Sequence, residues 1–556
     1  MTRATMSQVS AWHAAAAATA GEAVAAADSE FTAVMGQVAQ LVNSLLGEWQ
    51  GAAGTAAEVR AVEQQLCANH IGAALVDIAD AFAAAGTLER VCGEVEALEG
   101  EARAHGCRVG DDGVVTAARS GTGDLALDLI FQAGLDAEAK RMQARLIALL
   151  DCAGATDADA GARLTAAGVA LAALEVEPAV GQLDSRVAAV LGGTALLPDE
   201  PSELCALWRS LTPADQDALF AFDPLLGARD GLPALARDHY NRLSLARLTA
   251  AARDRQRWLT DEHPDWSRGQ QLPTTPHDWI RLHDWEAERQ RARDLLTGYA
   301  TVAAEVGPAE PNRLLLDLDG NGHAAIALGN PDAASNVATF VPGTGSALDE
   351  IDQGMNRVRN LLGAANRADA SARTAVIAWY GYDAPPTLSD ALGDRRARQG
   401  AVLLDAFESG LRATHPGPPA RATVIGHSYG GTLIGFAARE PGLAADAVIF
   451  VGTPGVDASD VSELRLVGIT PDRNTFHIFS TADLADPVPV LGRYLHGTNP
   501  VDREFLATVF TSSGGAVCLP VVCRMPFAVS AHGKYWEPGN PGLQVQGQII
   551  TGDYPR

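Results

Sequence analysis

The residues best suited to covalent chemistry lie in the sequence GHSYG, residues 426–430, which has the pattern G-x-S-x-G. An apolar run ends at Gly426, and apolar residues at helical spacing follow the pentapeptide. A strand that turns sharply into a helix exposes its middle residue, and flanking glycines leave room for the crowded backbone. The pattern therefore predicts Ser428 as a nucleophile at a helix N-terminus, where main-chain N–H groups stabilise negative charge.

A histidine further along the chain could serve as the general base for this serine. The histidines after Ser428 are His477, His496 and His532. His477 lies within an expected strand, and only His532 follows every expected strand. It completes the chain order Ser, Asp, His that accompanies this type of turn. Sequence position therefore predicts His532 as the base.

The acid that would orient this imidazole is expected in residues 480–488, directly after an apolar run. Asp486, within DPV, is the predicted acid, because a carboxylate there can hold the imidazole and stabilise its protonated form. Asp483 in the same segment is the alternative, and Asp457 is a more distant third candidate. The sequence leaves the choice between Asp486 and Asp483 open.

Backbone donors for a developing oxyanion are expected in VPGTGS, residues 341–346. Its glycines allow main-chain N–H groups to turn toward a carbonyl oxygen, so Gly343 and Thr344 are predicted to form an oxyanion hole with Tyr429. A further apolar segment carries three aromatic residues that could bind an acyl chain or ring, or could equally form a packed core edge. These predicted substrate-binding residues are Trp379, Tyr380 and Tyr382.

These candidates require a sheet that brings strand ends together. Apolar runs of strand length recur from residue 312 onward, and DGNG at 319–322 joins the first two as an antiparallel hairpin. The expected strands are 313–318, 323–328, 337–341, 374–379, 423–425, 447–452, 475–480 and 507–511. Most intervals can hold a crossover helix, which predicts an α/β fold with a mainly parallel, eight-stranded sheet. Catalytic groups should then lie just beyond the carboxyl ends of the strands.

The hairpin turn also has some features of a calcium-binding loop. Asp317, Asp319 and Asn321 occupy ligand-like positions, but Leu328 stands where the bidentate Glu is required. The cysteines have no metal-ligand spacing. We therefore expect no metal and no cofactor.

The chain before the sheet is expected to be helical. Apolar residues step by three and four from Val34 onward, WQG at 49–51 separates two long helical segments, and a turn is expected near Asp157. Thr212, followed by proline and an acidic residue, predicts a helix start. The expected parts are a helical bundle (1–197), a helical segment bracing or capping the catalytic part (198–300), and the catalytic domain (301–556).

Composition restricts the partners. The chain has 556 residues, and its formal charge of −26 argues against nucleic acid and anionic membrane surfaces. No apolar run is long enough for a transmembrane helix, and the Ala-rich N-terminus lacks the leucines of a Sec signal peptide. We expect a cytoplasmic location by default, with export by a type VII-like route as the alternative. The helical bundle would suit a helical partner or self-association.

Two resemblances add to this interpretation. From about Pro201 to the C-terminus, the chain resembles an actinobacterial family of α/β-hydrolases, formerly a domain of unknown function. The resemblance rests on LLGARDGLPALARDHYNR, AAIALGNPDAASNVATFVPGTGS, TAVIAWYGYDAP, TVIGHSYGGTL, VIFVGTPGVD and HGKYWEPGNPGL. It implies a serine hydrolase fold in which Ser428, His532 and an acid near Asp486 form the triad. Two long helices joined by W-x-G resemble the WXG100 class of type VII secretion, although no Tyr precedes Tyr240 to supply the usual Y-x-x-x-[DE] export tag.

The sequence therefore predicts a serine hydrolase that cleaves carboxylic ester or thioester bonds of a small-molecule or lipid-like substrate through an acyl-enzyme intermediate. One alternative is a non-catalytic type VII substrate or scaffold with a relic hydrolase domain. Another is an acyltransferase or perhydrolase on the same fold.

Overall fold

In a computed structural model, the chain forms two compact units, residues 1–181 and 182–556. The structure describes residues 3–12, 14–46, 52–119, 125–175, 183–269, 275–307, 310, 312–440, 442–492, 496–512 and 529–553. Within these ranges, no helix combines the length and the apolar character that a membrane span requires. The boundaries expected at residues 197 and 300 stay predictions.

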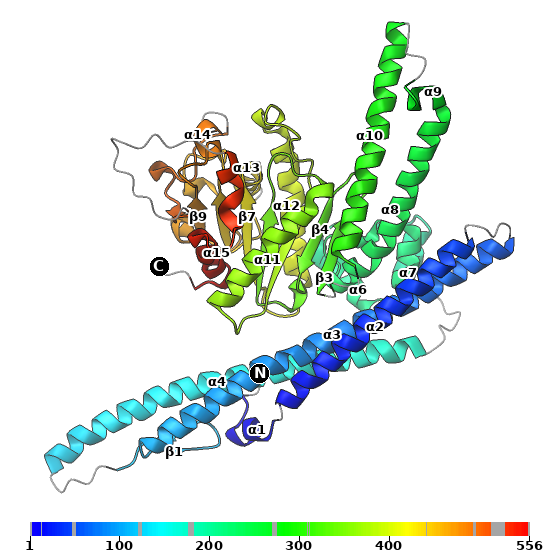
Figure 1. Cartoon of the computed structure of the whole chain (residues 1–556). Helices are drawn as coiled ribbons and strands as arrows, with labels where there is room; N and C mark the ends of the chain where they lie inside the picture. Colours follow the sequence, from blue (N-terminus) through cyan, green and yellow to red (C-terminus); the bar gives the residue numbers. More distant parts are fainter. Residues whose placement is uncertain are drawn as a thin grey trace. The chain divides into compact units, whose positions relative to one another are not determined.

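The first unit is mainly helical, as the sequence predicted (Figure 1). Its helices are α1 (Met6–Ala11), α2 (Ala14–Leu46), α3 (Ala52–Ala104) and α4 (Leu125–Glu175). Helix α3 packs against both α2 and α4. A short antiparallel pair, β1 (Arg108–Val109) and β2 (Val115–Thr116), follows α3.

The turn expected near Asp157 is wrong, because α4 continues through that residue. Gly and Asp lower helix propensity, but packing overrides so weak a preference. Ala153 is fully buried in the small core of this unit, and Arg163 pairs with Asp159 one turn earlier at 3.0 Å. The WQG sequence at 49–51 lies outside the described residues, so the WXG100-like interpretation stays a prediction.

The second unit is built on a sheet that has eight strands within the described residues, and the predicted α/β fold is confirmed. The strands are β3 (Arg313–Leu318), β4 (Ala324–Leu328), β5 (Asn336–Val341), β6 (Thr374–Tyr380), β7 (Arg421–His427), β8 (Ala447–Val451), β9 (Ile478–Thr481) and β10 (Thr508–Val509). Their order is β10-β9-β8-β7-β5-β6-β4-β3, and only the pairings of β3 with β4 and of β4 with β6 are antiparallel. Strand β9 starts after His477 rather than at 475, because Pro471 begins a 3₁₀ helix that ends at Phe476.

Helices cover both faces of this sheet. They are α11 (Ile351–Ala368), α12 (Arg395–Thr414), α13 (Tyr429–Arg439) and α15 (Pro541–Thr551), and a short helix α14 (Val488–Gly492) follows β9. Side chains of β6 alternate between the two cores: Ile377 and Trp379 pack with α12 and α13, whereas Val376 and Ala378 pack with α11 and α15. Because both faces are buried, the strand sequences are continuously apolar.

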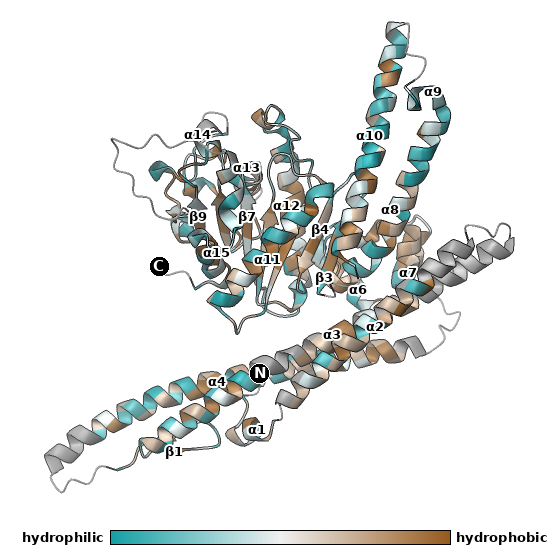
Figure 2. Cartoon of the chain, viewed as in Figure 1, coloured by the Kyte–Doolittle hydropathy of each residue, from teal (hydrophilic) through white to brown (hydrophobic). Residues whose placement is uncertain are grey.

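Helices also precede the sheet in the second unit. They are α5 (Ser185–Leu191), α6 (Pro201–Ser210), α7 (Pro213–Phe222), α8 (Ala234–Glu262), α9 (Pro264–Ser267) and α10 (Pro276–Glu305). Helix α8 is attached to the edge strand β3, because Asn241 Nδ2 donates to Leu315 O at 3.0 Å and Leu315 N donates to Asp238 Oδ1 at 2.7 Å. Beyond the sheet, α8 and α10 continue side by side as hydrophilic helices, whereas the strands are apolar (Figures 1 and 2).

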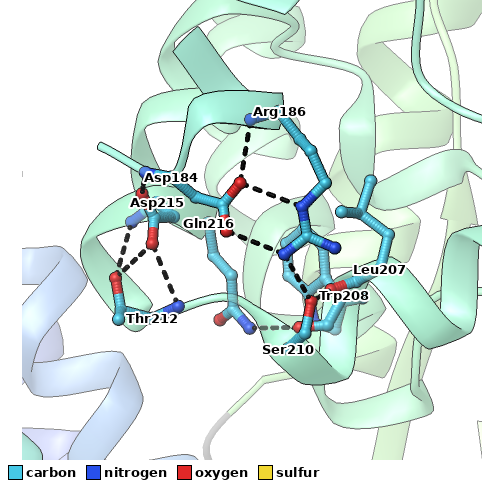
Figure 3. Close-up of polar contacts among 8 residues, drawn as sticks. All are labelled: Asp184, Arg186, Leu207, Trp208, Ser210, Thr212, Asp215 and Gln216. Carbon is cyan, nitrogen blue, oxygen red and sulfur yellow. Dashed lines mark hydrogen bonds and ion pairs between the residues drawn. The ribbon is translucent and has the colours of Figure 1, made fainter. Parts of the chain in front are cut away.

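A polar network joins α5, α6 and α7 at the start of this unit (Figure 3). Thr212 caps α7 by accepting a hydrogen bond from Asp215 N, and the Asp215 carboxylate accepts one from Thr212 N. That carboxylate also accepts a hydrogen bond from Asp184 N at 2.8 Å, while Asp184 pairs with Arg186. This capping box confirms the helix start that the sequence predicted at Thr212.

Candidate active site

Ser428 occupies the sharp connection between β7 and α13. Its backbone has φ 55° and ψ −125°, a combination that non-glycine residues rarely adopt and that this type of turn requires. The neighbouring glycines have no space for a side chain: a Cβ on Gly426 would lie 2.6 Å from Gly431 Cα. The pentapeptide therefore folds as a strained strand-to-helix turn with Ser428 at its apex.

The loop after β5 lies beside this serine. A Cβ on Gly343 would come within 2.7 Å of Ser428 Cβ and 3.1 Å of Tyr429 N, so only glycine permits this approach. Within the described residues, neither Thr344 N–H nor Tyr429 N–H donates a hydrogen bond. Gly345 N–H, by contrast, donates to Pro385 O at 2.8 Å. Two main-chain donors next to Ser428 are thus available to an oxygen atom.

Asp486 and His532 are in direct contact. His532 Nδ1 lies 2.7 Å from Asp486 Oδ2, and the Asp486 side chain has no exposure to solvent. The other carboxylate oxygen accepts a hydrogen bond from Val488 N at 2.9 Å. If His532 Nδ1 carries the hydrogen and donates it to Asp486, then Nε2 is the unprotonated nitrogen, which can act as a base.

The other two candidate acids have different partners. Asp483 Oδ1 accepts a hydrogen bond from Ala485 N at 2.8 Å, as in a local turn. Asp457 pairs with Arg439 at 2.8 Å. Within the described residues, neither carboxylate contacts His532, so the geometry favours Asp486 over both.

His532 contacts His427, the residue that directly precedes Ser428 in the chain. The two imidazole rings lie 4.5 Å apart between centroids, and His427 Nε2 donates to the main-chain oxygen of His532 at 2.8 Å. Burial lowers the pKa of His427 well below its ordinary value, so this ring is neutral and carries its proton on Nε2. No hydrogen bond joins Ser428 Oγ to His532 in the part of the chain described. Such contacts often tighten only when substrate is bound.

The three aromatic residues predicted to bind substrate are buried. Trp379 is 1% exposed, and Tyr380 and Tyr382 are each 5% exposed. The Trp379 ring stacks on Tyr382, whose hydroxyl donates to Pro342 O at 2.8 Å. The packing of Trp379 and Tyr382 supports the loop that carries Gly343, whereas Tyr380 packs in the core on the other face of the sheet. Contact of any of the three with a substrate stays a prediction.

Two residues of this site were not assigned a role from the sequence, namely His427 and Tyr535. The signal for Tyr535 is its spacing from His532: residues three apart in a 3₁₀ helix share one face. The 3₁₀ helix η8 (Val529–Trp536) contains both. For His427 the sequence carries no comparable signal, because its contact depends on the path of a segment more than 100 residues later.

The hairpin that resembled a calcium loop is occupied by internal hydrogen bonds. Asp319 Oδ1 accepts from Asn321 N and His323 N, and Asp319 Oδ2 contacts His323 Nδ1 at 2.9 Å. His323 Nε2 in turn contacts Asp383 at 3.2 Å. Both carboxylate oxygens of Asp319 therefore have hydrogen-bond partners within the hairpin turn.

Comparison with known proteins agrees with this fold. Residues 317–492 match the family model described as alpha/beta hydrolase. The uncharacterized protein Rv2079 of Mycobacterium tuberculosis is 31% identical over 315 residues, which are 54% of this chain and 45% of that relative. The uncharacterized protein Mb0988c of Mycobacterium bovis is 28% identical over 256 residues, which are 44% of this chain and 92% of the relative. The similarity to alpha/beta hydrolases thus covers residues 317–492, and the chain spans less than half the length of the first of these relatives.

Proposed function

We propose that the chain is a serine hydrolase that cleaves carboxylic ester or thioester bonds through Ser428, His532 and Asp486. The observation that carries this proposal is the buried contact between His532 Nδ1 and Asp486 Oδ2, near the apex of a strained G-x-S-x-G turn. A histidine with a purely structural role would not need a buried carboxylate on Nδ1 while Nε2, within the described residues, has no hydrogen-bond partner.

In the proposed reaction, His532 Nε2 takes the proton of Ser428 Oγ as that oxygen attacks the acyl carbon. The negative charge moves to the former carbonyl oxygen, where Thr344 N–H and Tyr429 N–H stabilise it. Asp486 stabilises the imidazolium that forms and does not itself take the proton. The intermediate collapses when the leaving oxygen or sulfur takes the proton from His532, and the acyl group stays on Ser428.

The second half of the proposed reaction releases the acyl group. His532 takes a proton from a water molecule, whose oxygen attacks the acyl carbon of the ester on Ser428. Return of that proton to Ser428 Oγ frees the carboxylic acid and restores the enzyme. Binding of an alcohol or peroxide in place of water would give the acyltransferase or perhydrolase alternative.

Turnover of short p-nitrophenyl esters tests this proposal. We expect the Ser428→Ala variant to lose on the order of 10³-fold or more in kcat/KM. Ser512→Ala is the matched control, because Ser512 is also buried and its hydroxyl has no hydrogen-bond partner within the described residues. Equal turnover by Ser428→Ala and the unmodified protein would rule out Ser428 as the nucleophile, and a folded but inactive unmodified protein would favour the scaffold alternative.

A further inference from the structure

A tyrosine hydroxyl shares the carboxylate oxygen that binds His532. Tyr535 Oη lies 2.6 Å from Asp486 Oδ2, the same atom that lies 2.7 Å from His532 Nδ1. Asp483 N–H donates to Tyr535 Oη at 3.0 Å. Because that main-chain group can only donate, the single hydroxyl hydrogen of Tyr535 must point at Asp486.

The local fold explains why both donors meet at one oxygen. His532 and Tyr535 are three residues apart in η8, where side chains at this spacing are nearly eclipsed. Gly452, at the end of β8, leaves the space they need: a Cβ there would lie 2.9 Å from Asp486 Oδ2 and 3.1 Å from Tyr535 Oη. Tyr535 itself is 1% exposed, and burial together with Asp486 raises its pKa above the ordinary value. The phenol therefore keeps its proton and acts only as a donor to the carboxylate.

We propose that Tyr535 is a positioning residue that lowers the proton affinity of the Asp486–His532 pair, an inference that rests on the proposed hydrolase function. A hydrogen bond to an ionised carboxylate stabilises its charge, and a buried carboxylate depends on such bonds for lack of water. With part of its charge satisfied by Tyr535, Asp486 attracts a proton on His532 less strongly. The imidazole of His532 then stays unprotonated, and able to act as a base, at a lower pH than it would if Tyr535 did not donate to Asp486.

The other ionisable groups near the pair do not supply this effect. Asp483 donates its main-chain N–H to Tyr535, while its carboxylate accepts a hydrogen bond from Ala485 N. His427 is neutral because its pKa is lowered by burial. Arg357, beyond His427, has its guanidinium 5.3 Å from the centre of the Trp536 ring. Among the described residues, Tyr535 is thus the only side chain besides His532 that donates to Asp486.

The test is the pH dependence of kcat/KM for a p-nitrophenyl ester in the full chain carrying Tyr535→Phe. We expect the acidic limb to move up by about one pH unit, with KM changed less than about twofold, because the pair binds a proton more readily without the donor. Tyr240→Phe is the matched control, since Tyr240 is equally buried and its hydroxyl donates to Asp217 at 2.8 Å outside the site. An acidic limb at the same pH in Tyr535→Phe and the unmodified protein, or an activity loss that is equal at every pH, would overturn the proposal.

A readout without turnover separates this inference from the proposed function. NMR titration of isotope-labelled histidine in the full chain should show a higher pKa for the His532 ring in Tyr535→Phe than in the unmodified protein. That shift in a protein without esterase activity would uphold the role of Tyr535 and reject only the proposed function. Fluorotyrosine at position 535, a stronger donor, should move the His532 pKa in the opposite direction. Unchanged His532 titration in both variants would overturn the proposal whether or not the protein is active.

Discussion

At the scale of single residues, the site combines a strained serine with an imidazole whose two nitrogens have different surroundings. Ser428 has positive φ in a turn where Gly426, Gly430 and Gly431 have no room for a Cβ. His532 directs Nδ1 at a carboxylate without solvent exposure, which fixes the tautomer. His427 holds the main chain of His532 by a hydrogen bond and keeps no charge of its own. The backbone strain of Ser428 thus depends on the surrounding glycines, and the tautomer of His532 depends on Asp486.

Two aspartates, Asp486 and Asp483, are candidates for the acid that orients His532. We expect Asp486→Asn to lower kcat by on the order of 10³-fold to 10⁴-fold, because an amide can turn an N–H toward His532 and favour the wrong tautomer. Asp483→Asn should change kcat less than about threefold, since within the described residues its carboxylate accepts a hydrogen bond from Ala485 N alone. Steady-state kinetics on p-nitrophenyl esters would show the difference. A larger loss in Asp483→Asn than in Asp486→Asn would reverse the assignment.

The limits of sequence reasoning are clearest among these residues. The local turn pattern and the chain order, which depend on sequence alone, predict Ser428 and His532 as catalytic residues, and these roles stay predictions. The choice between Asp486 and Asp483 could not be predicted, because the two residues are three apart and only the packing of Asp486 against Gly452 and η8 separates them. The contacts of Tyr535 and His427 depend in the same way on long-range packing.

At the scale of elements, the loop after β5 must approach the turn between β7 and α13 closely. These two strands are neighbours in the sheet, and their register pairs Val341 with Gly426. Both strands therefore end at the same level, which places Gly343 against Ser428. The parallel pairing of these strands therefore brings the predicted oxyanion donors to Ser428, the proposed nucleophile.

We predict that Gly343→Ala lowers kcat about 10²-fold, because the added Cβ would displace the loop from Ser428 and from Tyr429 N. Gly363→Ala in α11 is the matched control. Its Cβ would meet only the end of the flexible Arg367 side chain, and alanine favours a helix. Thermal unfolding should shift by only a few degrees in either variant. Full activity in Gly343→Ala would show that this loop does not contribute to catalysis.

Strands and helices could be predicted where the sequence pattern that indicates them lies within the element itself. Strands buried on both faces appear as continuous apolar runs, so the sheet was anticipated within a few residues at most strand ends. The start of β9 was misjudged because Thr475 and Phe476, the first residues of the expected strand 475–480, belong to the 3₁₀ helix Pro471–Phe476. The break in α4 was misjudged because buried packing around Ala153 outweighs the glycines and aspartates near residue 157.

At the scale of the whole molecule, a buried acid should make stability depend on pH. Glu408 on α12 is 1% exposed, and burial raises its pKa to about 7. In the unfolded chain a glutamate loses its proton near pH ~4.3, so between these values the folded state binds more protons and stability falls as pH rises. The loss is complete once the pH exceeds the folded pKa.

Glu408→Gln removes this titration and keeps the side-chain shape. We expect the melting temperature of Glu408→Gln, relative to that of the unmodified protein, to increase by about a few degrees as pH rises from about 4.5 to about 7. Above that pH the difference should stay constant. Glu440→Gln, at an exposed position, should follow the unmodified protein throughout. Parallel melting curves for Glu408→Gln and the unmodified protein across this range would contradict the expected protonation of Glu408.

The division into two units leads to a further expectation. Every residue assigned to the reaction lies between 343 and 535, within the unit formed by residues 182–556. We predict that this unit, produced alone, hydrolyses p-nitrophenyl esters with a kcat/KM within about threefold of the full chain. A folded but inactive 182–556 fragment would show that the helical unit contributes to the site.

The central claim is that Ser428 is a nucleophile activated by His532 and Asp486, and covalent labelling tests it most directly. The full chain is incubated with a fluorophosphonate, digested, and the modified peptide identified by mass spectrometry. The account predicts a single adduct on Ser428, absent in Ser428→Ala and much slower to form in Asp486→Asn. An adduct on another residue, or none on a folded protein, would contradict it.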